Sequence, residues 1–245
     1  MDCLPLLASV LGNQYGVTVE IGGSEAYTDG KTIHLPALPL DSEPELITMI
    51  KGYCDHESAH IRETDFEILR KANLTPFQHN LFNILEDWRV EERLSARYPG
   101  CRENFRHLIQ KLFGTQKAGD TNPAFSILNI ILLTVRSWSV NAIIPRRESV
   151  AKTMERHYPG LRKALDGILD RVRDSCKDTG DSIQYALELE QAIFVWNLEQ
   201  KNITEPEKKN LGAPQDKTVA SSNASLDSLA KAVGALSSDE LPRGF

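Results

Sequence analysis

The chain has 245 residues, of which 41% are hydrophobic and 25% charged, enough for one sizeable domain with a buried core. This composition excludes a wholly disordered or fibrous protein. Acidic residues (34) outnumber Lys and Arg (28), which gives a net charge of −6 and a pI ≈ 5.6. The sign of this charge argues against a nucleic-acid partner.

The cysteines and the apolar segments indicate a cytoplasmic protein. The four cysteines are widely spaced, with no C-x-x-C pair, which predicts neither a zinc knuckle nor a disulfide framework. They are Cys3, Cys54, Cys101 and Cys176. The apolar N-terminus has an acidic lead and a proline, unlike a signal peptide. The most apolar segment, 124–135, is too short to span a membrane.

The first predicted elements are two short strands. Residues 17–21 alternate apolar and polar side chains, and residues 32–35 follow a turn signal at 29–31. We expect a small antiparallel hairpin that ends at Pro36.

Two helix starts follow. Ser42 and Glu45 form a capping-box pattern with Pro44 in the first turn, which predicts a helix through residue 60. Thr75, followed by Pro76 and Gln78, predicts a second helix that runs to about residue 97.

The rest of the chain is predicted to be helical and then unstructured. Helical patterns cover 103–113, 123–141, 148–157, 161–176 and 181–199. Residues 201–245 contain one aromatic residue and many polar ones, so we expect a flexible linker or tail, with a weak amphipathic helix at 226–236. The predicted domain is 1–200, with a motif core at 17–95 and a helical remainder at 96–200. Its fold class is mainly α with a small sheet (α+β).

The most informative motif is His56-Glu57-Ser58-Ala59-His60. On a helix, His56 and His60 lie one turn apart and can address one metal ion, and Zn²⁺ suits two imidazoles plus a carboxylate. Glu57 would then act as general base toward a zinc-bound water in a peptidase. The alternative is an exposed histidine pair on a charged helix end.

A third ligand is expected from the next helix, where carboxylates interrupt an apolar stretch. We assign Glu86 as the metal ligand, with Asp87 and Asn83 as supporting residues around the site. Periodicity alone does not separate Glu86 from Asp87, because each lies one turn from Asn83. The alternative is that these carboxylates form ion pairs with Arg89, Arg93 or Arg70.

Three blocks of sequence, at 26–36, 55–66 and 83–91, together resemble the N-terminal metallopeptidase-like region of cobaltochelatase CobT-type proteins and their phage relatives. The resemblance covers roughly residues 17–95. It implies a zincin-like metallopeptidase fold of the gluzincin type, with one Zn²⁺ per chain held by His56, His60 and Glu86, and Glu57 as base. In that family this region precedes a von Willebrand factor A domain that works with an AAA+ ATPase, so either is a candidate partner.

The resemblance also gives the predicted strand 32–35 a role. In zinc peptidases an edge strand beside the motif helix pairs with extended substrate. The candidate residues are Thr32, Ile33, His34 and Leu35.

Four further side chains could stabilise transition-state charge, and spacing does not choose among them: Tyr53, His79, Tyr98 and His107.

The sequence therefore predicts a cytoplasmic zinc-dependent metallopeptidase that acts on a protein or peptide, with no nucleic-acid or membrane partner. One alternative is a catalytically silent, zinc-stabilised protein-binding module related to the partner proteins of chelatases and AAA+ ATPases. Another is a helical interaction protein without metal.

Overall fold

The computed structural model describes residues 3–37, 43–114 and 123–208. In these residues the protein is mainly helical with a small three-stranded sheet, which confirms the α+β prediction. The strands are β1 (Thr18–Ile21), β2 (Tyr27–Thr28) and β3 (Thr32–Leu35). The first five helices are α1 (Leu4–Leu11), α2 (Pro44–Glu63), α3 (Phe66–Ala72), α4 (Pro76–Arg97) and α5 (Pro99–Phe113). The later ones are α6 (Pro123–Ser137), a 3₁₀ turn (Asn141–Ile143), α7 (Ile144–His157), α8 (Leu161–Ser175) and α9 (Thr179–Lys208).

The sheet differs from the predicted hairpin. Its strand order is β1-β3-β2, with β3 in the centre. The turn at Asp29 joins β2 to β3, because Asp29 Oδ1 accepts the backbone N–H groups of Lys31 and Thr32 at 2.8 Å each. β1 instead pairs with β3 in parallel. The expected antiparallel pairing of 17–21 with 32–35 is therefore wrong, since the chain reverses between β1 and β2 before the hairpin starts.

The two predicted helix starts are found. α2 begins at Pro44 after Glu43, whereas Ser42 lies outside the described residues. At the start of α4 both hydrogen bonds of the Thr75–Gln78 capping box are present. α2 ends at Glu63, so the histidine motif occupies its last turns.

The remaining helices follow the predicted segments with shifted ends. α5 starts at Pro99, and α1 and α3 were not predicted. α9 continues to Lys208, past the predicted end of the domain at 200. Residues 209–245, including the predicted helix at 226–236, lie outside the described residues. In the described part of the chain, no helix combines the length and apolarity needed to cross a membrane.

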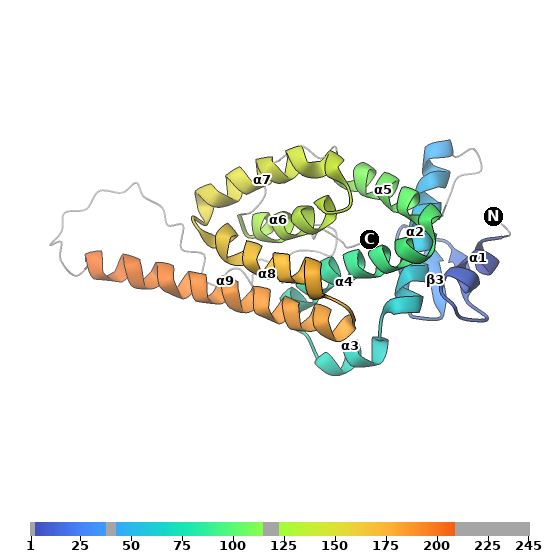
Figure 1. Cartoon of the computed structure of the whole chain (residues 1–245), viewed down its shortest axis with the longest axis horizontal. Coiled ribbons are helices and arrows are strands. Elements are labelled where there is room, and N and C mark those ends of the chain that lie inside the picture. The colour runs from blue at the N-terminus through green and yellow to red at the C-terminus, as the bar shows by residue number, and fades with distance from the viewer. Residues whose placement is uncertain (1–2, 38–42, 115–122, 209–245) are drawn as a thin grey trace.

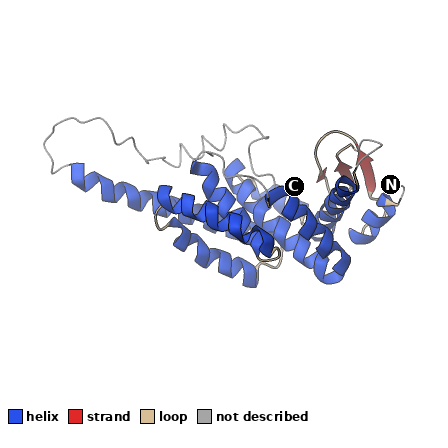
Figure 2. Ribbon diagram, turned by 90° about the horizontal axis from the view of Figure 1, so that it is seen from above, coloured by secondary structure: helices blue, strands red, loops and turns tan. Residues whose placement is uncertain are grey.

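Two hydrophobic cores lie on either side of α2. The larger one fills the space between α4 and the helices that follow it, and the smaller one joins α1, the sheet and α2. Figure 1 shows the sheet and α1 at one end of the molecule, with α6, α7 and α8 toward the other and α9 extending beyond them. Figure 2 shows the same division from above. α2 and α4, which carry the predicted site, meet between the two cores.

Candidate metal centre

Charged and polar side chains fill the contact between α2 and α4. On α2, Asp55, His56 and Glu57 are each 2–3% exposed. On α4, the buried charged residues are Glu86, Asp87, Arg89 and Glu91. Burying this many ionisable groups is unfavourable unless each is paired or binds a cation, so their partners define the chemistry of the site.

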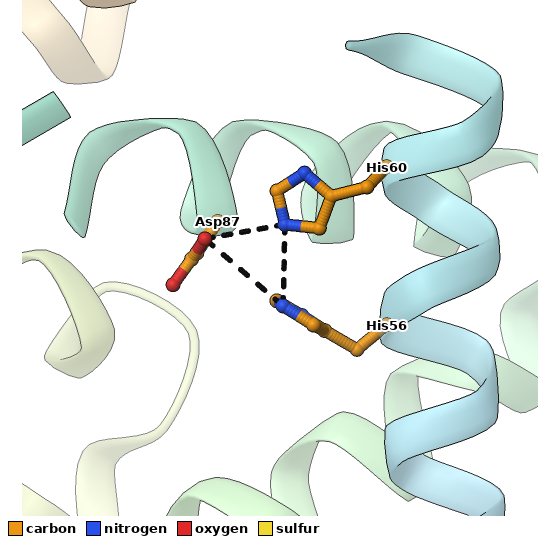
Figure 3. Close-up of side chains that lie close together, drawn as sticks. All are labelled: His56, His60 and Asp87. Atoms are coloured by element: carbon orange, nitrogen blue, oxygen red, sulfur yellow. Dashed lines mark hydrogen bonds and ion pairs between the residues drawn. The ribbon is translucent and has the colours of Figure 1, made fainter. Parts of the chain in front are cut away.

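His56 and His60 point from α2 toward α4, as their spacing predicts (Figure 3). Their Nε2 atoms lie 3.2 Å apart. Asp87 on α4 completes the group, with its Oδ1 at 3.2 Å from His60 Nε2 and 4.0 Å from His56 Nε2. These three donor atoms lie within 4.8 Å of one another and could hold a metal ion.

The Nδ1 atoms of both histidines have hydrogen-bond partners, which set the tautomers. His56 Nδ1 lies 2.8 Å from Glu91 Oε1, and a carboxylate can only accept. His60 Nδ1 lies 2.9 Å from Thr64 Oγ1, whose single proton is donated to Glu86 Oε1 at 2.9 Å. Both Nδ1 atoms therefore carry the proton, and both Nε2 lone pairs face the Asp87 carboxylate.

This arrangement fits a tetrahedral cation. Zinc–nitrogen bonds of about 2.0–2.1 Å place neighbouring tetrahedral ligand atoms about 3.3 Å apart. The distance between the two Nε2 atoms and the distance from His60 Nε2 to Asp87 Oδ1 are both 3.2 Å, close to this value. Two lone pairs at 3.2 Å repel unless a proton or a metal ion lies between them. The donor set, two imidazoles and a carboxylate, is typical of zinc sites.

The charges near the histidines also favour a divalent ion. Arg136, which is fully buried, contacts Asp87 Oδ2 at 3.2 Å and Glu91 Oε2 at 2.6 Å. The two carboxylates carry −2 and the guanidinium +1, a formal balance of −1, and an ionised Glu57 brings it to −2. A bound dication would neutralise this charge.

The contacts around the histidines and the burial of the site shift the pKa values of Asp87, His60 and Glu57. Burial opposes ionisation of Asp87, but the hydrogen bond that a protonated His60 donates and the positive charges of His56 and Arg136 outweigh it and lower the Asp87 pKa. Burial acts in the opposite direction on His60, yet Asp87 and Glu57 raise the His60 pKa. Burial dominates at Glu57, so the Glu57 pKa is raised.

Glu86, the predicted third ligand, lies in a different network. Its carboxylate accepts hydrogen bonds from Arg89 at 2.6 and 2.8 Å, from Thr179 at 2.9 Å and from Ser182 at 2.7 Å. The alternative ion pair with Arg89 is therefore what forms. Glu86 and Asp87 differ by about 100° around the helix, and this rotation turns Asp87, not Glu86, toward the histidines.

Glu57 and Asn83 line a pocket of about 250 Å³ beside the histidines. Its other lining residues are Tyr27, Thr28, His56, His60, Thr64, Phe66, Leu69, His79, Phe82 and Asp87. Of the four side chains considered for transition-state charge, His79 lines this pocket. Tyr98, by contrast, donates to the carbonyl of Val10 at 3.4 Å.

The predicted substrate strand has no free edge. β3, with Thr32, Ile33, His34 and Leu35, pairs with β1 on one side and β2 on the other. Its backbone donors and acceptors therefore face neighbouring strands, so strand addition at β3 is a wrong prediction. The strand that borders the pocket is β2, through Tyr27 and Thr28.

Three residues around the site were not predicted. Glu91 lies one turn after Asp87 on the same stripe of α4, a spacing that could have identified it. Thr64 follows His60 by four residues, so the spacing at the end of α2 could also have identified it. Arg136 reaches the site only through the packing of α6 against α4, for which the sequence carries no local signal.

The fold and the site together define a helical protein with a buried two-histidine, one-carboxylate cluster. The family model described as cobalamin biosynthesis protein CobT matches residues 2–232, so this chain belongs to the CobT family. No curated protein matches the chain. No solved structure matches it either.

This family overturns part of the prediction. It points to cobalamin biosynthesis and chelatase work, so the classification as a hydrolase, protease or metallopeptidase is wrong, and no comparison indicates a phage protein. His56 and His60 lie close together, as the spacing of the H-E-x-x-H motif predicts, but this spacing alone does not specify peptide hydrolysis. The resemblance to CobT-type proteins is confirmed at the level of the family.

Proposed function

We propose that this chain is a zinc-stabilised protein-binding module of a chelatase, in which His56, His60 and Asp87 hold one Zn²⁺. The observation that carries the proposal is the convergence of two oriented Nε2 atoms and one carboxylate oxygen within 4.8 Å in a member of the CobT family. When bound, the ion neutralises the buried carboxylates and links α2 to α4. Such a link contributes folding free energy.

The chain's own residues would hold and orient the ion's ligands. Glu91 fixes His56, Thr64 fixes His60, and Arg136 holds both Asp87 and Glu91. Hydrogen-bonded partners of this kind commonly set ligand orientation in zinc sites. We keep a zincin-like fold as a proposal that rests on this pair of helices, without any claim of peptide cleavage.

The proposed partners are the other proteins of the chelatase, of the CobS and CobN types. α9 supports a binding role because it exposes large apolar side chains, each 40–43% exposed: Leu187, Phe194, Val195 and Leu198. Rows of exposed apolar residues favour contact with another protein.

We place the module in the cytoplasm, where its four free cysteines would stay reduced.

Chelation tests the metal half of this proposal. A chelator is expected to lower the melting temperature of the zinc-loaded chain by several degrees and abolish binding to the AAA+ ATPase partner, with added Zn²⁺ restoring both. Glu57→Gln should keep the metal and the partner, because a binding module needs no general base. Unchanged melting and binding after chelation would refute a zinc-stabilised module.

A surface substitution tests the binding half. Phe194→Glu on α9 is expected to weaken partner binding at least tenfold, since it places a charge in the apolar row. Leu6→Glu, at an exposed apolar position on α1, is the matched control and should bind like wild type. Equal affinities for the two variants would exclude α9 as the contact surface.

A further inference from the structure

We propose that Thr64 is a positioning residue for the metal site, and that through Glu86 it makes metal affinity depend on the docking of α9. This inference rests on the proposed metal site. Neither Thr64 nor Glu86 is a ligand in it. Thr64 follows the last residue of α2, four residues after His60, and lines the same pocket.

The first link is the hydroxyl of Thr64. It donates to Glu86 Oε1 at 2.9 Å and so can only accept from His60 Nδ1, also at 2.9 Å. This fixes the proton of His60 on Nδ1 and leaves Nε2 free to bind a cation. Without the hydroxyl, the Nδ1–H loses its acceptor, and the ring is free to rotate or to adopt the other tautomer.

The second link is Glu86, which joins this hydroxyl to α9. Glu86 is 0% exposed and accepts five hydrogen bonds. Two of them come from the first turn of α9, from Thr179 and Ser182. Thr179 Oγ1 in turn accepts the backbone N–H of Asp65 at 2.9 Å, next to Thr64. A displacement of the first turn of α9 would therefore remove two of the five hydrogen bonds that hold Glu86, and the contact of Thr179 with the backbone beside Thr64.

The functional consequence concerns the same helix that exposes the apolar row. A partner that binds α9 and shifts its first turn would lower zinc affinity, and zinc binding would favour the docked helix by the same factor, because coupling between two sites is reciprocal. His60, Thr64, Glu86 and Thr179 form the contiguous chain of contacts that carries this coupling.

Competition with a chromophoric chelator measures the zinc affinity of full-length variants. Thr64→Val is expected to weaken zinc binding about 10- to 100-fold, the range for partners of metal-bound histidines. Thr64→Ser keeps the hydroxyl and should recover wild-type affinity within about threefold, well inside that range. Thr48→Val is the matched control on α2, because its hydroxyl donates to the Pro44 carbonyl of its own helix and, among the described residues, lies outside the contacts of the metal site.

Nitrogen-15 NMR of the zinc-loaded chain supplies a readout that general destabilisation would not change. The Nδ1–H resonance of His60 should persist in wild type and Thr64→Ser and be lost by solvent exchange in Thr64→Val.

Thr179→Val removes the next hydroxyl along the chain of contacts. It should weaken zinc binding less than Thr64→Val does, and it tests the chain of contacts if Thr64→Val does not fold.

The outcomes separate this inference from the metal site itself. If Thr64→Val and Thr179→Val bind zinc like wild type while His56→Ala does not, the positioning role is wrong and the metal site stands. If wild type binds no zinc, the proposed function fails with it. Weak binding by both Thr64→Val and Thr64→Ser would also overturn the role assigned to the hydroxyl.

Discussion

At the scale of single residues, the site depends on charges that are buried and paired. His56 and His60 could be predicted because four-residue spacing places two side chains on one face of any helix. That Asp87 and not Glu86 faces the histidines could not be predicted, because it depends on how α4 is rotated against α2. That rotation is held in part by Thr179 and Ser182, more than 90 residues away in the sequence.

Arg136 is the buried counterion of this site. Arg136→Met should destabilise the metal-free protein by about 3–5 kcal/mol, because it leaves the Asp87 and Glu91 carboxylates buried without their cation. Arg106→Met, which removes an exposed ion pair with Glu103 on α5, should change the free energy of unfolding far less, because solvent screens that pair. Urea unfolding in the presence of chelator measures both, and equal effects would contradict the role of Arg136.

At the scale of elements, helix starts were predicted better than strand pairing. Pro44 and the Thr75–Gln78 box act locally, so their residues alone identify the starts of α2 and α4. The parallel pairing of β1 with β3 depends on contacts across the sheet. α3 also starts at a local signal, because Asp65 Oδ1 accepts the N–H groups of Glu67 and Ile68 as an N-cap.

The close approach of α2 and α5 depends on Gly52. A Cβ at this position would lie 3.2 Å from Leu108 Cβ and 3.3 Å from the Asn104 carbonyl oxygen, so Gly52→Val should destabilise the protein by roughly 1–3 kcal/mol. Gly167→Ala in α8 meets no atom within 4 Å and should stabilise the protein by up to about 1 kcal/mol. Thermal unfolding of both variants checks these opposite signs.

The turn between β2 and β3 gives a pH dependence. Backbone hydrogen bonds from Thr32 and Lys31 hold the pKa of Asp29 below its ordinary value of 3.8. A lowered folded-state pKa contributes stability above the unfolded pKa, and this stability is lost as pH falls through the folded value. Asp29→Ala should therefore destabilise the protein modestly at pH 7, because solvent screens this exposed carboxylate. The difference from wild type should shrink below pH 3.8, and a difference that grew in acid would contradict this account.

At the scale of the whole molecule, α2 and α4 join a small core around the sheet to a larger helical core. α9 continues to Lys208, past the end of the predicted domain of 1–200. We expect a chain ended after Lys208 to bind one zinc ion as tightly as the full chain, since every residue of the site precedes it. A zinc titration of both chains, with far-ultraviolet circular dichroism to compare their folding, tests this expectation.

The central claim is that Asp87, with His56 and His60, holds a metal ion. The most direct test is the zinc content of wild type, Asp87→Asn and Glu86→Gln, saturated with Zn²⁺, freed of excess metal and measured by plasma mass spectrometry. We predict one zinc per chain in wild type and in Glu86→Gln, and much less in Asp87→Asn. Zinc lost from Glu86→Gln but kept by Asp87→Asn, or absent from wild type, would contradict the claim.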